Sequence, residues 1–362
     1  MKVAIVYDRV NKIGGAERVL ESLSELFPRS TLYTSIYNKK NTPWARKFKV
    51  RTSFLQKIPI INMRHEFIPY LMPFAFESFD FTGYDLVISV TSEASKGIIV
   101  PPDVAHICIC LTPTRYLWSG YDQYFRNPLL RFLSSPLVWY LRKWDIIAST
   151  RPDELIAISE NVARRIRKYY GRKSVVIYPP SDRLFQNHID RVADFENKNY
   201  FLVVSRLVDY KEVDLAVTAC TKLKLPLVVI GEGNELEKLR AIAGETIIFK
   251  GKVTDSQLIS YYKNCRALLF PGEEDFGITM VEVQLAGKPV IAYKAGGAVE
   301  IVQEGKSGIF FSKQTVSSLC KVLINFKDSR YNGNDCKKSG RRFSDRKFKS
   351  TLLRLLKEHK YI

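Results

Sequence analysis

The feature that most constrains the fold is a repeated alternation of short, Val- and Ile-rich apolar runs with amphipathic stretches long enough to form helices. Apolar strands separated by helices are typical of parallel sheets covered by helices on both faces. The alternation occurs twice, so we expect an α/β protein with two doubly wound sheets. The predicted strands lie near residues 2–7, 30–35, 86–90, 105–111, 154–158 and 174–177, and then near 200–205, 226–230, 246–249, 267–270, 289–293 and 308–310.

Chain length also favours two domains, because 362 residues exceed what one hydrophobic core usually supports. Residues 187–200, with the sequence NHIDRVADFENKNY, are polar and lack periodicity, so they are the expected linker. The final segment, 343–362, is basic and carries leucines at helical spacing, which predicts an amphipathic helix. We expect a first domain of residues 1–193 plus 346–362 and a second of residues 194–345.

The composition is that of a globular protein, with 46% hydrophobic and 26% charged residues. The beginning of the chain, MKVAIVYD, predicts a buried strand rather than a signal peptide. No run approaches the roughly 20 apolar residues of a membrane helix. The six cysteines are scattered and show no metal-binding spacing, which favours cytosolic thiols. We therefore expect a cytoplasmic protein, either free or at the inner face of the membrane.

The net charge of +19 predicts attraction to polyanions, whether nucleic acid, anionic lipid or a diphosphate substrate. Basic residues cluster at 163–173 and 337–360. Residues 65–81 are unusually aromatic, and residues 125–144 mix apolar and cationic side chains at near-helical spacing. Two interpretations of these last segments remain open: helices packed on the first sheet, or a surface that contacts an anionic membrane.

The most informative motif lies in residues 270–302, where a predicted strand, a loop and a helix follow one another. Gly277 lets a ligand approach the backbone, and the N–H groups from Ile278 onward form an anion site suited to a diphosphate. Carboxylates accept hydrogen bonds from vicinal hydroxyls, so Glu274 could hold a sugar and Glu282 a ribose. Taken alone, both glutamates also occupy ordinary positions for acids in a loop and in an early helical turn.

This motif resembles the Glu-x7-Glu signature of family 4 retaining GT-B glycosyltransferases. The two glutamates are Glu274 and Glu282. Phe276 and Gly277 lie between them, and the runs AGKPVIA and AGGAVEIV follow. The resemblance extends over essentially the whole chain. It implies the GT-B fold, in which an acceptor-binding and a donor-binding Rossmann-like domain face each other across a cleft. In the family, the first glutamate binds the donor sugar, the second binds the ribose, and the backbone after Phe-Gly binds sugar and phosphate. Those roles fall on Glu274, Glu282, Phe276, Gly277 and Ile278.

Two cations follow the first predicted strand of the second domain, at Arg206 and Lys211 in LVVSRLVDYKEVD. They resemble the family's arginine and lysine that bracket the donor diphosphate. Fixed cations stabilise the charge that develops on a departing nucleoside diphosphate. The chain has no Asp-x-Asp pair, so we expect no metal and no cofactor beyond the nucleotide-sugar. Val253 falls where the family's backbone reads the base.

In the first domain, Gly14 and Gly15 match the family's GGAE loop, which faces the donor phosphates. A glycine turn at a helix start is weak evidence by itself, because it often serves only as a tight turn. Glu17 in this loop is expected to pair locally rather than to react.

Residues 106–125 resemble the mannosyltransferase-like subgroup of this family, in which a Thr-Pro pair precedes Arg-Tyr and a tryptophan. The resemblance places Thr112, Arg115 and Trp118 on the acceptor or sugar side. Leu111 stands where the family usually has a histidine, which leaves the identity of the sugar open. His106 falls inside a predicted strand and is expected to be a core histidine.

The resemblance implies an enzyme that transfers a hexose with retention of configuration, first of all mannose from GDP-mannose, with Arg206, Lys211 and Glu274 in the catalytic roles. The expected acceptor is a lipid-diphosphate-linked oligosaccharide or a polysaccharide, as in lipopolysaccharide or exopolysaccharide synthesis. Peripheral contact with an anionic membrane agrees with such an acceptor.

Several alternatives remain open. One is a GT-B enzyme that uses a UDP-sugar, either a glucosyl- or N-acetylhexosaminyltransferase or an epimerase, and another is a phosphorylase. A basic nucleic-acid-binding protein belongs to a different class, but no recognition motif or base-stacking platform supports it, so no nucleic-acid partner is expected.

Overall fold

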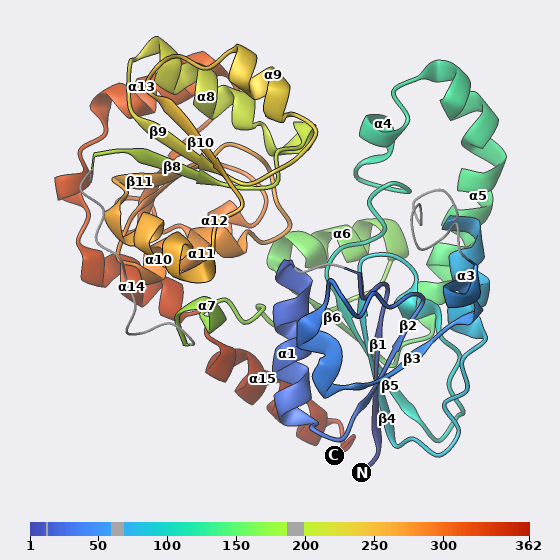
Figure 1. Ribbon diagram of the computed structural model, residues 1–362. Helices are drawn as coiled ribbons and strands as arrows, with labels where there is room; N and C mark the ends of the chain where they lie inside the picture. Colours follow the sequence, from blue (N-terminus) through green and yellow to red (C-terminus); the bar gives the residue numbers. More distant parts are fainter. Residues whose placement is uncertain (12–13, 59–68, 187–198) are drawn as a thin grey trace. The chain divides into compact units, whose positions relative to one another are not determined.

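The computed structural model describes residues 1–11, 14–58, 69–186 and 199–362 (Figure 1). The chain forms two compact units, one of Met1–Pro179 with Phe348–Ile362 and the other of Pro180–Lys347. The domain boundary expected near residue 194 lies outside the described residues.

The first unit contains a seven-stranded parallel sheet in the order β3-β2-β1-β4-β5-β6-β7. The six strands predicted in this half are all present, but β3 was not predicted. This strand has the sequence KVRT, lies at the sheet edge and has no fully buried residue, so it lacks the apolar run that marks a central strand. The strands are β1 Val3–Tyr7, β2 Thr31–Thr34, β3 Lys49–Thr52, β4 Leu86–Thr91, β5 Ala105–Cys110, β6 Glu154–Ala157 and β7 Val175–Val176.

The second unit contains a six-stranded parallel sheet in the order β10-β9-β8-β11-β12-β13, and every strand predicted there is present. The strands are β8 Phe201–Val204, β9 Leu227–Ile230, β10 Ile247–Gly251, β11 Ala267–Phe270, β12 Val290–Tyr293 and β13 Gly308–Phe311. The order reverses between β8 and β11, as it does between β1 and β4 in the first unit. Ligands of doubly wound sheets bind at the carboxyl ends of strands at such a reversal.

Helices connect the strands, as parallel pairing requires. Those of the first half are α1 Gly15–Leu26, α3 Met72–Glu77, α4 Tyr121–Tyr124, α5 Pro128–Thr150 and α6 Glu160–Tyr170. Those of the second half are α7 Arg183–Gln186, α8 Val213–Lys222, α9 Leu236–Ala241, α10 Asp255–Asn264, α11 Ile278–Leu285, α12 Ala298–Ile301, α13 Val316–Asn325, α14 Gly333–Arg341 and α15 Asp345–Glu358. Short 3-10 helices are η1 Pro43–Lys47, η2 Phe54–Lys57, η4 Pro69–Leu71, η5 Ser95–Gly97, η6 Asp209–Lys211 and η7 Asp328–Arg330.

Local sequence explains where several helices begin and end. The Ser159 hydroxyl accepts a hydrogen bond from the third residue of α6, and Gly171 ends this helix in the left-handed conformation. Thr254 and Gln257 form a capping box at the start of α10. The predicted C-terminal helix is present as α15, with Leu352 and Leu356 fully buried.

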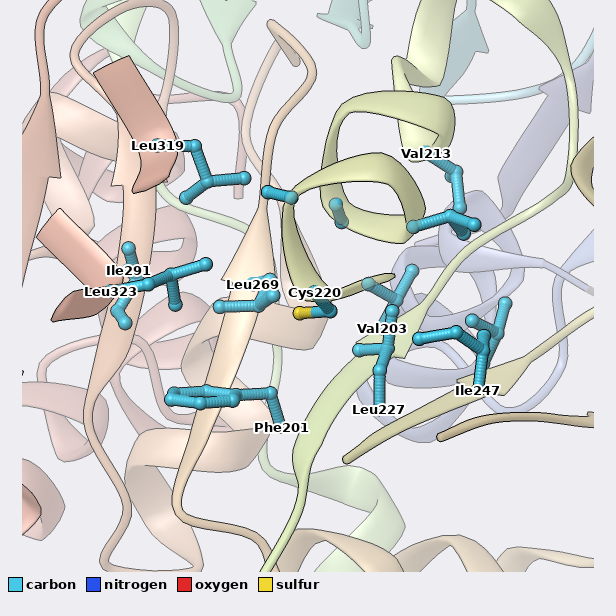
Figure 2. Packing of buried hydrophobic residues seen from close by; sticks show 14 of the residues in the cluster. Phe201, Val203, Val213, Cys220, Leu227, Ile247, Leu269, Ile291, Leu319 and Leu323 are labelled. Carbon is cyan, nitrogen blue, oxygen red and sulfur yellow. The ribbon is translucent and has the colours of Figure 1, made fainter. Parts of the chain in front are cut away.

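The core of the second unit lies between its sheet and the helices α8 and α13 (Figure 2). Side chains from all six strands of this sheet belong to the same cluster as Cys220 of α8 and Leu319 of α13, which explains why these strands are rich in apolar residues. The strand residues in this cluster include Phe201, Val203, Leu227, Leu269 and Ile291. All six cysteines of the chain are buried thiols.

The aromatic segment 65–81 is described from residue 69 onward, and its first four residues lie outside the described part. Met72, Phe76 and Phe81 are buried in the core of the first unit, which confirms packing on the sheet for this part of the segment. In the described parts of the chain, no helix combines the length and apolarity needed to cross a bilayer.

Candidate functional site

A pocket of ≈ 240 Å³, including space open to solvent, lies where the strand order of the second unit reverses. It is lined by residues 203–205, 211, 213, 269–272 and 274. These residues come from the carboxyl ends of β8 and β11, from η6 and from the loop after β11. The pocket therefore occupies the position at which parallel sheets of this kind bind ligands.

Two of the residues expected at the donor, Lys211 and Glu274, meet in this pocket. The Lys211 ammonium pairs with the Glu274 carboxylate, and the two side chains are 13% and 18% exposed. Lys211 ends η6, and the next residue, Glu212, adopts a left-handed conformation with φ 53° at the start of α8. The pocket thus presents a cation and an anion side by side, which suits a ligand with both charged oxygens and hydroxyl groups.

Arg206 follows β8 and is exposed, so it stands outside the lining of the pocket. Its guanidinium donates a hydrogen bond of 2.5 Å to the hydroxyl of Tyr210. Lys211 Nζ lies 5.1 Å from the centre of the same tyrosine ring. Tyr210 therefore contacts both cations.

The loop after β11 leads directly into α11. Gly277 caps this helix with φ 104°, a conformation that favours glycine, and an added Cβ would overlap Met280. Phe276 is buried and packs edge-on against Phe343, with ring centroids 5.3 Å apart. Phe276 therefore anchors the loop through its side chain, and the first backbone N–H groups of α11 follow at Ile278.

Gly296 and Gly297, in the AGG motif after β12, hold this loop from the other side. The Gly297 N–H donates a 2.8 Å hydrogen bond to the backbone carbonyl of Glu274. A Cβ at Gly296 would overlap the backbone of Glu274, and one at Gly297 would overlap that of Phe276. Two adjacent glycines are needed here because the two loops touch backbone to backbone.

Glu282 lies in α11 and is buried. Its Oε2 accepts a 2.8 Å hydrogen bond from the hydroxyl of Tyr262, a fully buried residue of α10. This contact fixes the orientation of the carboxylate. Sequence reasoning missed Tyr262, since an aromatic residue on the buried face of a helix carries no distinct signal. Val253 is half-buried in the turn between β10 and α10.

In the first unit, Gly14 caps α1 in an extended conformation and Gly15 is the first residue of the helix. Residues 12–13 of the same loop lie outside the described part of the chain. The Tyr7 hydroxyl donates a 3.2 Å hydrogen bond to buried Glu17, which confirms the expected local pairing. Burial and the Glu17 carboxylate raise the pKa of Tyr7 well above its usual value.

Asp8, directly after β1, holds the loop that follows β4. Its buried carboxylate accepts hydrogen bonds of 2.6–3.0 Å from four consecutive backbone N–H groups, those of residues 92–95. This arrangement positions Glu93, which pairs with Arg9 at 2.5 Å and accepts a 2.9 Å hydrogen bond from the Tyr116 hydroxyl. Burial raises the pKa of Glu93, even though Arg9 acts to lower it.

Behind this loop lies a second buried group, the ion pair between Lys96 and Asp145 at 2.5 Å, with both side chains 1% exposed. Burial lowers the pKa of Lys96, but the Asp145 carboxylate raises it and the net effect is a rise. Asp145 also accepts hydrogen bonds from Thr114, from the Trp118 indole N–H at 2.7 Å and from Tyr170 at 2.8 Å. The network fixes the β4 and β5 loops to α5.

Three residues were expected on the acceptor or sugar side of the first domain. The indole N–H of Trp118 points into the buried network, and the ring stacks on Tyr169 with centroids 5.1 Å apart. Thr112 is buried and Arg115 is half-buried. Sequence reasoning found these residues but missed Asp8, Glu93, Lys96 and Asp145. The position of Asp8 after the apolar strand β1, and of Glu93 and Lys96 after β4, is a signal that could have identified these three.

His106 is a core histidine, as expected. It is fully buried within β5, and its Nε2 lies 2.8 Å from the hydroxyl of Ser89 on β4. Burial lowers its pKa to about 3. Leu111 follows β5 and is half-buried, with its N–H bonded to the carbonyl of Thr91.

Comparison with known proteins agrees with this geometry. Residues 185–343 match the family Glycosyl transferases group 1. The O-antigen chain mannosyltransferase C of Escherichia coli is 24% identical over 177 residues, and a GDP-mannose-dependent alpha-mannosyltransferase of Mycolicibacterium smegmatis is 27% identical over 175 residues. Each match covers 46% of this chain and 46% of the relative. The chain spans about half the length of the curated relatives it matches.

Among solved structures, Anabaena Alr3699/HepE in complex with UDP is similar, with a TM-score of 0.68 and 18% identity over 99% of this chain and 100% of that one. At this identity the likeness establishes the fold. The chain therefore has the GT-B fold, and the larger part of its second unit is similar to the glycosyl transferases group 1.

Proposed function

We propose that the chain is a retaining glycosyltransferase that moves a hexose, first of all mannose from GDP-mannose, to a lipid-linked oligosaccharide or a polysaccharide. The observation that carries this proposal is the pairing of Lys211 with Glu274 in a pocket that is lined in part by the loop leading into α11. A nucleotide-sugar has the complementary groups: an anionic diphosphate next to a ring of hydroxyls.

Groups that line the pocket and groups on the elements next to it suit the parts of such a donor. The N–H groups that follow Gly277, together with the positive end of the helix dipole, favour the diphosphate. Lys211 and Arg206 add two cations on the β8 side. Glu274 accepts hydrogen bonds from sugar hydroxyls, and Glu282, held by Tyr262, accepts those of the ribose. Before the donor binds, Lys211 and Glu274 neutralise each other in the ion pair. When the donor binds, its diphosphate competes with Glu274 for the lysine, and its sugar hydroxyls compete with Lys211 for the carboxylate.

The same residues suggest how the reaction proceeds. The bond between the anomeric carbon and the diphosphate oxygen breaks, and the acceptor hydroxyl attacks from the same face, which retains the configuration. A diphosphate oxygen takes the hydroxyl proton, so no protein base is needed. Arg206, Lys211 and the start of α11 stabilise the negative charge that develops on the leaving group. In this scheme Glu274 orients the sugar and Glu282 the nucleotide, and neither transfers a proton.

GDP-mannose is the first candidate donor because two matching relatives are named as mannosyltransferases, one of them GDP-mannose-dependent. A UDP-sugar is the second candidate, since the similar Anabaena structure holds UDP. Leu111 leaves this choice to experiment, because its half-buried apolar side chain offers no hydrogen bond to a sugar. A lipid-diphosphate-linked acceptor, used in lipopolysaccharide or polysaccharide synthesis at the inner face of the membrane, completes the proposal.

A thermal-shift panel of GDP-, UDP- and ADP-sugars tests the donor. We expect GDP-mannose at 100 times its dissociation constant to stabilise the protein by about 2.7 kcal/mol, and GDP-glucose to stabilise it less at equal concentration. Stabilisation by UDP-sugars alone would overturn the choice of mannose. Stabilisation by none of them would overturn the donor site itself.

A further inference from the structure

The first turns of α5 carry large apolar side chains that are exposed to solvent. Leu129, Phe132 and Leu133 are 65%, 75% and 64% exposed, and residues 128–133 are exposed throughout. Figure 1 shows α4 and the beginning of α5 projecting beyond the strands of the first unit. Farther along, the second half of α5 is packed through Asp145 and Ala148. The sequence left segment 125–144 open between packing and surface contact; in the structure its later part is packed and its first part is exposed.

The exposed apolar side chains lie on one face of α5. They recur at spacings of three and four residues, which places them on one stripe of a helix. We call this set the α5 stripe; it consists of Leu129, Phe132, Leu133, Leu137 and Tyr140.

The opposite face of α5 holds the helix to the first unit. Val138 and Leu141 are buried against Leu117, and Arg142 Nε donates a 2.7 Å hydrogen bond to the Leu117 carbonyl. The helix thus differs from an ordinary surface helix, because its outward face also carries large apolar side chains.

Such a stripe is unfavourable in water. Leu129 and Tyr140 are 11 residues apart, so the stripe extends for about 17 Å along the helix, at 1.5 Å per residue. Monomeric proteins rarely expose contiguous apolar patches unless these bind something. Trp139 is 64% exposed beside the stripe, and amphipathic rings of this kind favour the headgroup region of a bilayer.

The charges around the stripe select the partner. Residues 126–143 contain no acidic side chain, and three of their four basic residues are exposed: Arg126, Arg131 and Lys143. A second copy of the chain would bring like charges together, whereas an anionic lipid surface complements them. The net charge of +19 acts in the same direction.

We propose that the α5 stripe inserts into the interfacial region of an anionic bilayer and holds the protein there through apolar contact as well as charge. This inference rests on the proposed function in one respect: a lipid-linked acceptor gives the enzyme a reason to reach a membrane. High salt weakens electrostatic adsorption to a membrane but does not weaken the burial of apolar side chains. If the stripe inserts, part of the membrane binding therefore persists at high salt.

Cosedimentation of the full chain with vesicles of phosphatidylcholine and phosphatidylglycerol tests the proposal. We expect the double variant Phe132→Ser/Leu133→Ser to lower the partition coefficient by about 100-fold. The control Ile324→Ser removes an apolar side chain that is 67% exposed on α13 and should change it little. We also expect vesicles with brominated acyl chains to quench the fluorescence of Trp139, and Trp139→Phe to abolish that quenching.

Two results would overturn the inference: unchanged partition of the double variant, or lipid-independent dimers that this variant abolishes. Donor binding, measured on the same preparations, keeps the two proposals separate. If the wild-type protein inserts into vesicles but binds no nucleotide-sugar, the proposed function alone is contradicted. Normal donor binding without insertion would contradict the α5 proposal alone.

Discussion

Asp145→Ala is expected to lower the free energy of unfolding of the first unit by about 3–5 kcal/mol, because it leaves the Lys96 ammonium buried without its carboxylate. The cost is large since neither side chain reaches solvent. The hydroxyls of Thr114 and Tyr170 and the indole N–H of Trp118 lose an acceptor as well. Urea unfolding followed by tryptophan fluorescence measures the change.

Asp122→Ala is the matched control, because this aspartate also pairs with a basic residue, Arg131, but its side chain is 82% exposed. An exposed ion pair contributes little, so the control should change stability by less than about 1 kcal/mol. Lys96→Met together with Asp145→Leu should recover part of the loss, since no charge then remains buried. A loss below about 1 kcal/mol for Asp145→Ala alone would contradict the structural role of the pair.

Lys211→Met is expected to lower kcat by about 100- to 1000-fold in a transfer assay with saturating donor. The lysine stabilises charge that develops only as the nucleoside diphosphate departs, so its loss should raise KM less than it lowers kcat. The freed Glu274 would then face the diphosphate without a neighbouring cation, which adds to the loss.

Lys222→Met provides the control for that assay, because Lys222 is an exposed cation at the end of α8 in the same unit. It should leave kcat and KM unchanged, which separates a local effect at the pocket from a general loss of positive charge. A kcat of Lys211→Met within about threefold of the wild type would rule out the leaving-group role.

Most of the fold could be predicted because most of its strands are largely buried and therefore appear as apolar runs. The exception shows the limit of this signal. The edge strand β3, Lys49–Thr52, pairs only with β2 and carries two basic residues in its four positions. Its existence depends on the neighbouring strand, which no local pattern reveals.

The candidate site was only partly predictable, for a similar reason. Glu274 and Lys211 were identified from loops that follow strands, and the structure brings them together. The buried polar network of the first unit combines Lys96, Trp118 and Asp145, which come from separate elements. Contacts between such elements arise only when the sheet and α5 are assembled.

The most direct test of the central claim is a calorimetric titration of GDP-mannose into the wild type and the Glu282→Gln variant. Glutamine keeps the size of the side chain and an oxygen for Tyr262, so the fold should persist while the charged hydrogen bonds to the ribose are lost. Glu237→Gln, on the exposed surface of α9, is the control. We expect Glu282→Gln to bind GDP-mannose about 10- to 100-fold more weakly than the wild type and the control to bind equally well. Equal affinity of Glu282→Gln and the wild type, or no binding by either, would contradict the account.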